Sequence, residues 1–136
     1  MPLTTYTGGC HCGDVRFEVD ADLDPRTQMK LLDCNCSMCT KKGIVHLMVP
    51  AAQFRLLTSR EALSTYTFNT HVAQHTFCKR CGIHSFYTPR SHPDHIDVNV
   101  RCLDGVDPWA LQIERFDGAN WEANVASIRD DKGGVA

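Results

Sequence analysis

Hydrophobic and polar residues alternate with a period of two along much of the chain, as in β-strands that bury one face. The clearest runs are residues 15–20 and 96–101, in which every second residue is Val, Phe or Ile and the others are charged or amide residues. Both runs indicate strands, and that at 15–20 is half-buried. Apolar runs predict further short strands at residues 29–34, 44–49, 84–88 and 111–115.

Two stretches with aromatic and β-branched residues, 65–69 and 72–78, predict a hairpin between these strands. The turn is expected at residues 69–71, and the aromatic core candidates are Tyr66, Phe68 and Phe77. Residues 50–54 predict a tight turn or a single helical turn.

A helical period is found only at the end of the chain. Trp121, Val125 and Ile128 are spaced to lie on one face of a helix, and Asn120 is a suitable N-cap. Residues 130–136 are expected to be frayed. With about ten short strands and one short C-terminal helix, the sequence predicts a mainly β fold.

Length and composition fit an ordinary globular protein. The chain has 136 residues, of which 43% are hydrophobic and 22% charged, so we expect one core and a single domain over residues 1–136. A net charge of −2 argues against nucleic acid as a partner. No apolar run reaches membrane-spanning length, and the N-terminus has no signal-peptide pattern, so a cytoplasmic location is predicted.

Seven of the eight cysteines lie in three short segments. Residues 34–39 contain a C-x-C-x-x-C run, and pairs of cysteines occur at 10/12 and 78/81. In a reducing compartment such clusters are more often metal ligands than disulfides. A disulfide framework is further disfavoured because a disulfide between the cysteines of a C-x-C pair is strained.

The count of cysteines predicts two zinc sites of different kinds. Structural zinc has four protein ligands, whereas catalytic zinc has three and one open position. The two pairs, Cys10/Cys12 and Cys78/Cys81, supply the closed site, and Gly82 permits the positive φ of a zinc knuckle. The triplet of Cys34, Cys36 and Cys39 then holds the second zinc, with one coordination position open.

Several neighbouring residues have two possible roles. Cys102 stands alone and is interpreted as a buried hydrophobic residue, and the alternative is that it is the fourth ligand of the triplet site. Four basic residues either offset the thiolate charge or bind anionic ends of a substrate: Lys41, Lys42, Lys79 and Arg80. Five histidines are interpreted as core residues or as groups that hydrogen-bond the ligands: His11, His46, His71, His75 and His84.

An open zinc with three thiolates predicts thiol chemistry. Three thiolates make zinc a poor Lewis acid, so hydrolysis is disfavoured. Such a zinc suits a fourth thiolate, which coordination deprotonates at neutral pH. The expected reaction joins or separates a bound thiolate and a small carbon electrophile.

The cysteine motifs resemble those of the glutathione-dependent formaldehyde-activating enzyme family. The resemblance rests on order and spacing across about residues 7–103, with the signatures at residues 8–17, 34–39 and 77–82. Residues 65–82 and 85–91 resemble the centromere protein V branch of that family.

This resemblance implies a β-tent fold with two zinc ions per chain. Cys10, Cys12, Cys78 and Cys81 would hold the structural ion, and the triplet the catalytic one. It also implies carbon–sulfur lyase activity, in which glutathione and formaldehyde interconvert with S-(hydroxymethyl)glutathione. Polarity and closeness to the knuckle suggest four contacts for a glutathione-like ligand: Asn69, Thr70, His71 and Gln74.

A second hypothesis belongs to a different functional class. Two structural zinc ions would support a surface for a protein partner, and the chain would be a non-catalytic β-tent interaction module. A fourth protein ligand at the triplet, such as Cys102, would favour this module, and an open position would favour the enzyme.

Overall fold

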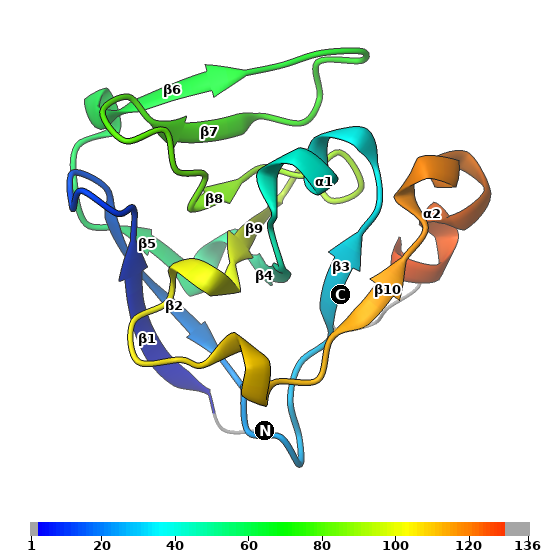
Figure 1. Cartoon of the computed structure of the whole chain (residues 1–136), viewed down its shortest axis with the longest axis horizontal. Helices are drawn as coiled ribbons and strands as arrows, with labels where there is room; N and C mark the ends of the chain where they lie inside the picture. Colours follow the sequence, from blue (N-terminus) through cyan, green and yellow to red (C-terminus); the bar gives the residue numbers. More distant parts are fainter. Residues whose placement is uncertain (1–2, 130–136) are drawn as a thin grey trace.

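Short strands make up most of the fold, and a computed structural model describes them for residues 3–129 (Figure 1). Within that range there are ten strands and two α-helices. The strands are β1 Thr4–Gly9, β2 Arg16–Ala21, β3 Leu31–Cys34, β4 His46–Pro50, β5 Phe54–Leu56, β6 Leu63–Tyr66, β7 His75–Cys78, β8 Phe86–Tyr87, β9 His95–Asn99 and β10 Glu114–Phe116. The helices are α1 Ser37–Lys42 and α2 Trp121–Arg129.

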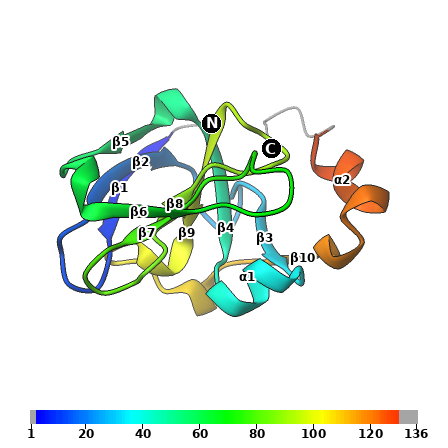
Figure 2. The ribbon, with the colours of Figure 1, turned by 90° about the horizontal axis from the view of Figure 1, so that it is seen from above.

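The strands form three open sheets. The first has the order β1-β2-β5, the second β10-β3-β4-β9-β8, and the third is the β6-β7 hairpin. Every pairing is antiparallel except that of β10 with β3. Viewed from above, the hairpin crosses over β8 and β9, while α1 and α2 lie toward the β3 and β10 end of the second sheet (Figure 2). The fold is therefore mainly β with open sheets, as predicted.

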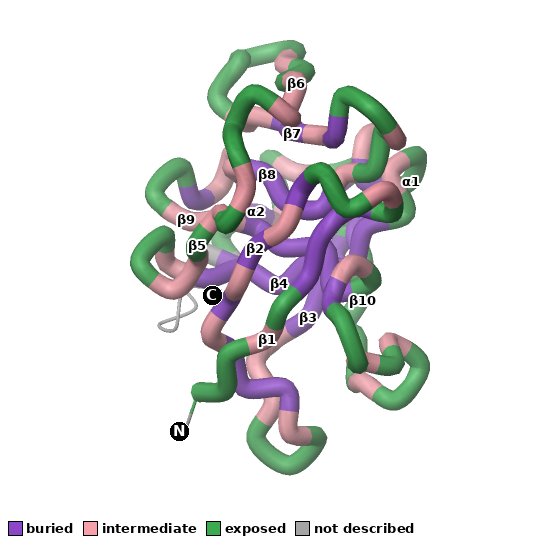
Figure 3. The backbone as a smooth tube through the Cα atoms, turned by 90° about the vertical axis from the view of Figure 1, so that its left-hand side faces the viewer, coloured by how far each residue is buried: buried purple, intermediate pink, exposed green. Residues whose placement is uncertain are grey.

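One face of the five-stranded sheet forms the main core. It presents Leu31, Leu47 and Val98, all fully buried, to the three-stranded sheet. Phe17 of β2 fills the space between the two sheets, with its ring centroid 5.3 Å from that of Phe54 and 6.0 Å from that of Phe86. The burial of apolar side chains between the sheets is the main stabilising contribution at this face. Figure 3 shows the buried backbone in the middle of the molecule, around β3 and β4.

The opposite face of the same sheet is buried too, but it carries polar groups. His46 is paired with Leu32 on one side and with Asn99 on the other, and Tyr87 is paired with Asp97. Residues that are paired across a sheet lie on the same face, so these side chains share one surface. Asp97 is only 1% exposed. The alternation at residues 96–101 therefore indicates the strand but not the burial of its polar side chains, because both faces of β9 are covered at Asp97 to Asn99.

The predicted strands are found, with boundaries shifted by one to three residues, and the single helical turn of 50–54 is a 3₁₀ turn over Ala51–Gln53. The C-terminal helix is also confirmed. The sequence does not predict helix α1, which contains Cys39 and has Cys36 as its N-cap, nor strands β1 and β5. None of the three aromatic core candidates lies in the core: Tyr66 is 50% and Phe68 40% exposed, because the hairpin projects from the molecule, and Phe77 is half-buried outside both core clusters.

Two expectations concern the ends of the chain and the membrane. The fraying predicted for residues 130–136 lies outside the described residues. Neither helix within residues 3–129 is both long and apolar enough to cross a lipid bilayer.

Replacing Phe17 by Ala should lower the free energy of unfolding by about 3–5 kcal/mol, because it opens a cavity between two sheets. Denaturant unfolding followed by circular dichroism measures this change. The control is Leu57→Ala, since Leu57 is 55% exposed and its loss should change the free energy by about 0.5 kcal/mol or less. Equal effects of the two substitutions would contradict the placement of the core.

Candidate metal centres and the adjoining cavity

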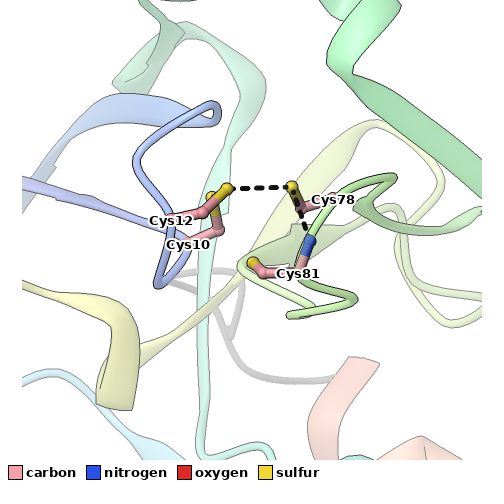
Figure 4. Close-up of side chains that lie close together, drawn as sticks. All are labelled: Cys10, Cys12, Cys78 and Cys81. Carbon is pink, nitrogen blue, oxygen red and sulfur yellow. Dashed lines mark hydrogen bonds between the residues drawn. The ribbon is translucent and has the colours of Figure 1, made fainter.

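Four cysteine sulfurs from distant parts of the chain meet in one cluster. Cys10 and Cys12 come from the turn between β1 and β2, and Cys78 and Cys81 from the end of β7 and the turn after it (Figure 4). All four sulfurs lie within 4.8 Å of one another. The turns are shaped by glycine, since Gly82 has a φ of 76°, as the knuckle motif predicted.

The spacing of these sulfurs fits a tetrahedral zinc ion. The Sγ atom of Cys12 lies 3.6 Å from those of Cys10 and Cys78. Four sulfurs at 2.3 Å from a tetrahedral zinc would be roughly 3.8 Å apart. Backbone N–H groups also point at the sulfurs: Val15 donates to Cys10 at 3.3 Å and Arg80 to Cys78 at 3.3 Å. Such donors stabilise thiolates, so the donor set suits a metal ion.

The cysteine triplet forms a second cluster, built on the start of α1. Cys34 ends β3, Cys36 is the N-cap of α1, and Cys39 lies in its first turn. The Cys36 sulfur accepts a hydrogen bond from the Cys39 N–H at 3.2 Å, and the three sulfurs lie within 4.8 Å of one another. Gly118 packs against this cluster so closely that an added Cβ would lie 2.3 Å from the Cys34 sulfur.

The three thiols of the triplet share protons unequally. Hydrogen bonds from the Cys34 and Cys39 thiols lower the pKa of Cys36 to about 2. The same contact with Cys36 raises the pKa of Cys34 to about 11. Since a metal ion takes thiolates, its binding would release protons.

Cys102 is placed apart from the triplet. The two groups of at least three potential metal ligands within residues 3–129 do not include it. Its thiol lies 3.9 Å from the carbonyl oxygen of His84, and burial raises its pKa. Cys102 is half-buried, so the predicted burial is found only in part, and it is not a fourth ligand of the triplet.

A cavity of about 400 Å³ opens directly on the triplet. Its floor is the polar face of the five-stranded sheet, and its walls come from α1, the β6–β7 loop, the segment after β8, and α2 with the turn before it. The lining includes the apolar side chains Leu32, Met48, Phe116 and Trp121 and the polar side chains His46, Asn69, His75, Tyr87, Arg90 and Asp97. Both its size and its mixed lining are typical of small-molecule sites.

The four residues suggested as ligand contacts are divided by the structure. Asn69 and Thr70 line the cavity. His71 and Gln74 are absent from the lining and instead hold the loop, since the Gln74 side chain donates to the His71 carbonyl at 3.0 Å. Asn69 and His71 both have positive φ angles, of 56° and 59°. The loop over the cavity is therefore held in a strained shape. A role in ligand binding remains a prediction for all four residues.

Of the four basic residues, only Lys42 is half-buried, and it contacts His75 and Tyr87 of the cavity lining. Its ammonium group lies 3.7 Å from the centre of the Tyr87 ring and donates to Nδ1 of His75 at 3.0 Å. Burial lowers the pKa of Lys42 to about 8, and burial together with Lys42 lowers that of His75 to about 4. His75 is therefore a neutral acceptor near pH 7. The other three, Lys41, Lys79 and Arg80, are exposed.

Sequence analysis missed the most buried polar pair in the cavity, His46 and Asp97. The two side chains are joined by a hydrogen bond of 2.6 Å between Nδ1 and Oδ2. The sequence pattern indicates only a core or ligand-bonding role for His46 and a polar strand position for Asp97. A hint exists in β4, where His46 interrupts an otherwise apolar run.

Replacing Gly118 by Ala should abolish metal binding at the triplet, because the new methyl group would overlap the Cys34 sulfur. Metal analysis of the purified variant should find about one zinc per chain, against about two for the wild type. Gly105→Ala is the control, since a Cβ there meets nothing within 4 Å, although its φ of 69° costs about 1 kcal/mol. Two zinc ions in Gly118→Ala would contradict the close packing of Gly118 against the triplet.

Comparison with known proteins places this geometry in a family. The model of the family described as glutathione-dependent formaldehyde-activating enzyme matches residues 5–118, which include both cysteine clusters. A crystal structure of a Rhodobacter sphaeroides protein, a Northeast Structural Genomics target, has a TM-score of 0.72 and 34% identity. That match covers 81% of this chain and 99% of the other. The chain therefore belongs to the glutathione-dependent formaldehyde-activating enzyme family.

Proposed function

We propose that the chain is a zinc-dependent carbon–sulfur lyase. Its reaction would interconvert glutathione plus formaldehyde with S-(hydroxymethyl)glutathione, or act on a closely related thiol adduct. Family membership supports glutathione and formaldehyde as the reactants. The observation that carries the proposal is the three-sulfur cluster, which has no fourth ligand among the described residues and opens on a cavity.

The two clusters suit two zinc ions with different tasks. Cys10, Cys12, Cys78 and Cys81 would form a closed structural site, and thiolate ligands in a tetrahedral arrangement favour zinc. The triplet would form the catalytic site. Zinc held by these three cysteines would supply an open position that favours the thiolate form of a substrate thiol near neutral pH.

The cavity supplies what a thiol adduct of peptide size needs. Leu32, Met48 and Phe116 give it apolar walls that would exclude water from the reacting carbon. Asn69 and Thr70 offer hydrogen-bonding groups from the opposite wall. At the rim, the Arg90 guanidinium lies 3.7 Å from the Trp121 ring centre and would attract an anionic end of the ligand.

Further assignments remain our proposals. We propose that residues 1–136 form one domain. We also propose that the protein is located in the cytoplasm. The likeness to the centromere protein V branch rests on residues 65–91 of the sequence. The interaction-module hypothesis is less well supported, because it requires a fourth protein ligand at the triplet.

Two cysteine substitutions separate the tasks of the clusters. Cys36→Ser should leave a folded protein with one zinc and reduce turnover by more than about 100-fold, since even changes behind metal ligands cost 10- to 100-fold. Cys78→Ser should be largely unfolded, because structural zinc contributes on the order of 10 kcal/mol and domains are stable by only about 5–15 kcal/mol.

The measurements are zinc content, circular dichroism and the exchange of ¹³C-formaldehyde into the glutathione adduct followed by NMR. Cys102→Ser is the matched control, because Cys102 lies outside both clusters and should keep two zinc ions and full turnover. Full activity in Cys36→Ser would disprove the catalytic assignment. A stable Cys78→Ser protein with two zinc ions would disprove the structural one.

A further inference from the structure

The floor of the cavity contains two ionisable side chains at positions where a sheet normally carries apolar residues. His46 is 5% exposed and Asp97 1% exposed. Burying such groups costs free energy unless each polar atom has a partner. Two of their atoms, Nε2 of His46 and Oδ1 of Asp97, have no hydrogen-bond partner among the described residues. This arrangement points to a partner that binds in the cavity.

The hydrogen bond between the two side chains determines which nitrogen of His46 carries the proton. Nδ1 of His46 lies 2.6 Å from Oδ2 of Asp97 and 3.4 Å from the Tyr87 hydroxyl. A carboxylate can only accept, so Nδ1 carries a hydrogen and donates it. In the neutral ring Nε2 is then a bare acceptor, and in the charged ring it is a donor.

His46 belongs to the same surface as the triplet. It is paired with Leu32, and Cys34 lies two residues further along β3, so the side chains of all three lie on one face of the sheet. His46, Asp97 and the three cysteines line the same cavity. If a substrate thiol bound at the triplet, the aldehyde carbon that bonds to its sulfur would thus lie in the part of the cavity that His46 lines.

The other basic groups in or beside the cavity each have a hydrogen-bond partner on the protein. Lys42 donates to Nδ1 of His75 at 3.0 Å, and the His75 ring stacks between Tyr87 at 4.8 Å and Phe68 at 5.5 Å. Arg90 donates to Glu122 at 3.0 Å and stacks on Trp121. Among the described histidines that line the cavity, only His46 has a buried ring nitrogen without a hydrogen-bond partner.

We propose that His46 is the catalytic acid–base residue of the lyase reaction and that Asp97 is the residue that positions it. This inference rests on the proposed function.

In adduct formation the thiolate sulfur bonds to the aldehyde carbon, and the C=O π pair moves to oxygen. That oxygen takes the proton of His46 Nε2 and becomes the hydroxyl group. Nε2 receives this proton beforehand from the substrate thiol, so His46 begins and ends the cycle with an unprotonated Nε2, and the sum is thiol plus aldehyde giving the hydroxymethyl thioether. In the reverse direction Nε2 removes the hydroxyl proton as the C–S bond breaks.

Two substitutions test the two roles. His46→Asn keeps an N–H near the position of Nδ1 but lacks Nε2, so formaldehyde exchange should fall by about 10²- to 10⁴-fold. Zinc content and glutathione affinity, measured by calorimetry, should be unchanged. Asp97→Asn offers an N–H to Nδ1 and so favours the opposite tautomer, which should slow exchange at least about tenfold.

Another His–Asp pair provides the matched control. His95 lies on the same strand and its Nδ1 is 2.8 Å from Oδ1 of Asp94, but it is not among the residues that line the cavity. His95→Asn should therefore leave the exchange rate unchanged.

A spectroscopic measurement on the wild-type protein decides the tautomer without any substitution. Two-dimensional ¹⁵N NMR of the zinc-loaded protein should show His46 with a protonated Nδ1 and an unprotonated Nε2, and Asp97→Asn should reverse this. A protonated Nε2 with a bare Nδ1 in the neutral wild-type ring would overturn the proposal, as would full exchange activity in a folded His46→Asn protein. If His46→Asn does not fold, the spectrum and Asp97→Asn decide. Absence of exchange in the wild type would instead overturn the proposed function itself.

Discussion

The cluster of four sulfurs joins parts of the molecule that strand pairing leaves separate. Cys10 and Cys12 belong to the three-stranded sheet, and Cys78 and Cys81 to the β6–β7 hairpin and the turn after it. No strand of one of these sheets is paired with a strand of the other within the described residues. A metal ion at the cluster would close a loop of more than 60 residues, and long loops are where such a link most reduces the entropy of the unfolded chain.

The five-stranded sheet depends on this link because the hairpin covers part of its polar face. That face holds His46 and Asp97 away from solvent, while the other face packs against Phe17 in a purely apolar core. The five-stranded sheet thus separates the apolar core on one face from the cavity with its ionisable side chains on the other. Burial also strengthens the hydrogen bond between the two side chains, since fewer water molecules compete for it. The same strands therefore determine both stability and the chemistry of the cavity.

The cysteine clusters could be predicted because the spacing within each segment is local, and because the number of ligands that zinc needs leaves few ways to combine the segments. It also located the alternating strands, since period-two patterns are strong at residues 15–20 and 96–101. It failed where the answer depends on distant packing. Asp97 is buried because other segments cover the second face of β9, and no local pattern reports that cover. Helix α1 has only six residues and is anchored at its start by Cys36, so it shows no apolar period.

The two clusters offer a metal ion different numbers of sulfur ligands, four at one and three at the other. Zinc X-ray absorption tests this difference most directly. Averaged over two zinc ions, the free protein should show about 3.5 sulfur ligands per ion at about 2.3 Å, together with a light-atom ligand. Addition of glutathione should raise the average to about 4, because the substrate thiolate completes the triplet site. An average of 4 before glutathione is added, or no change on its addition, would contradict an open three-cysteine site.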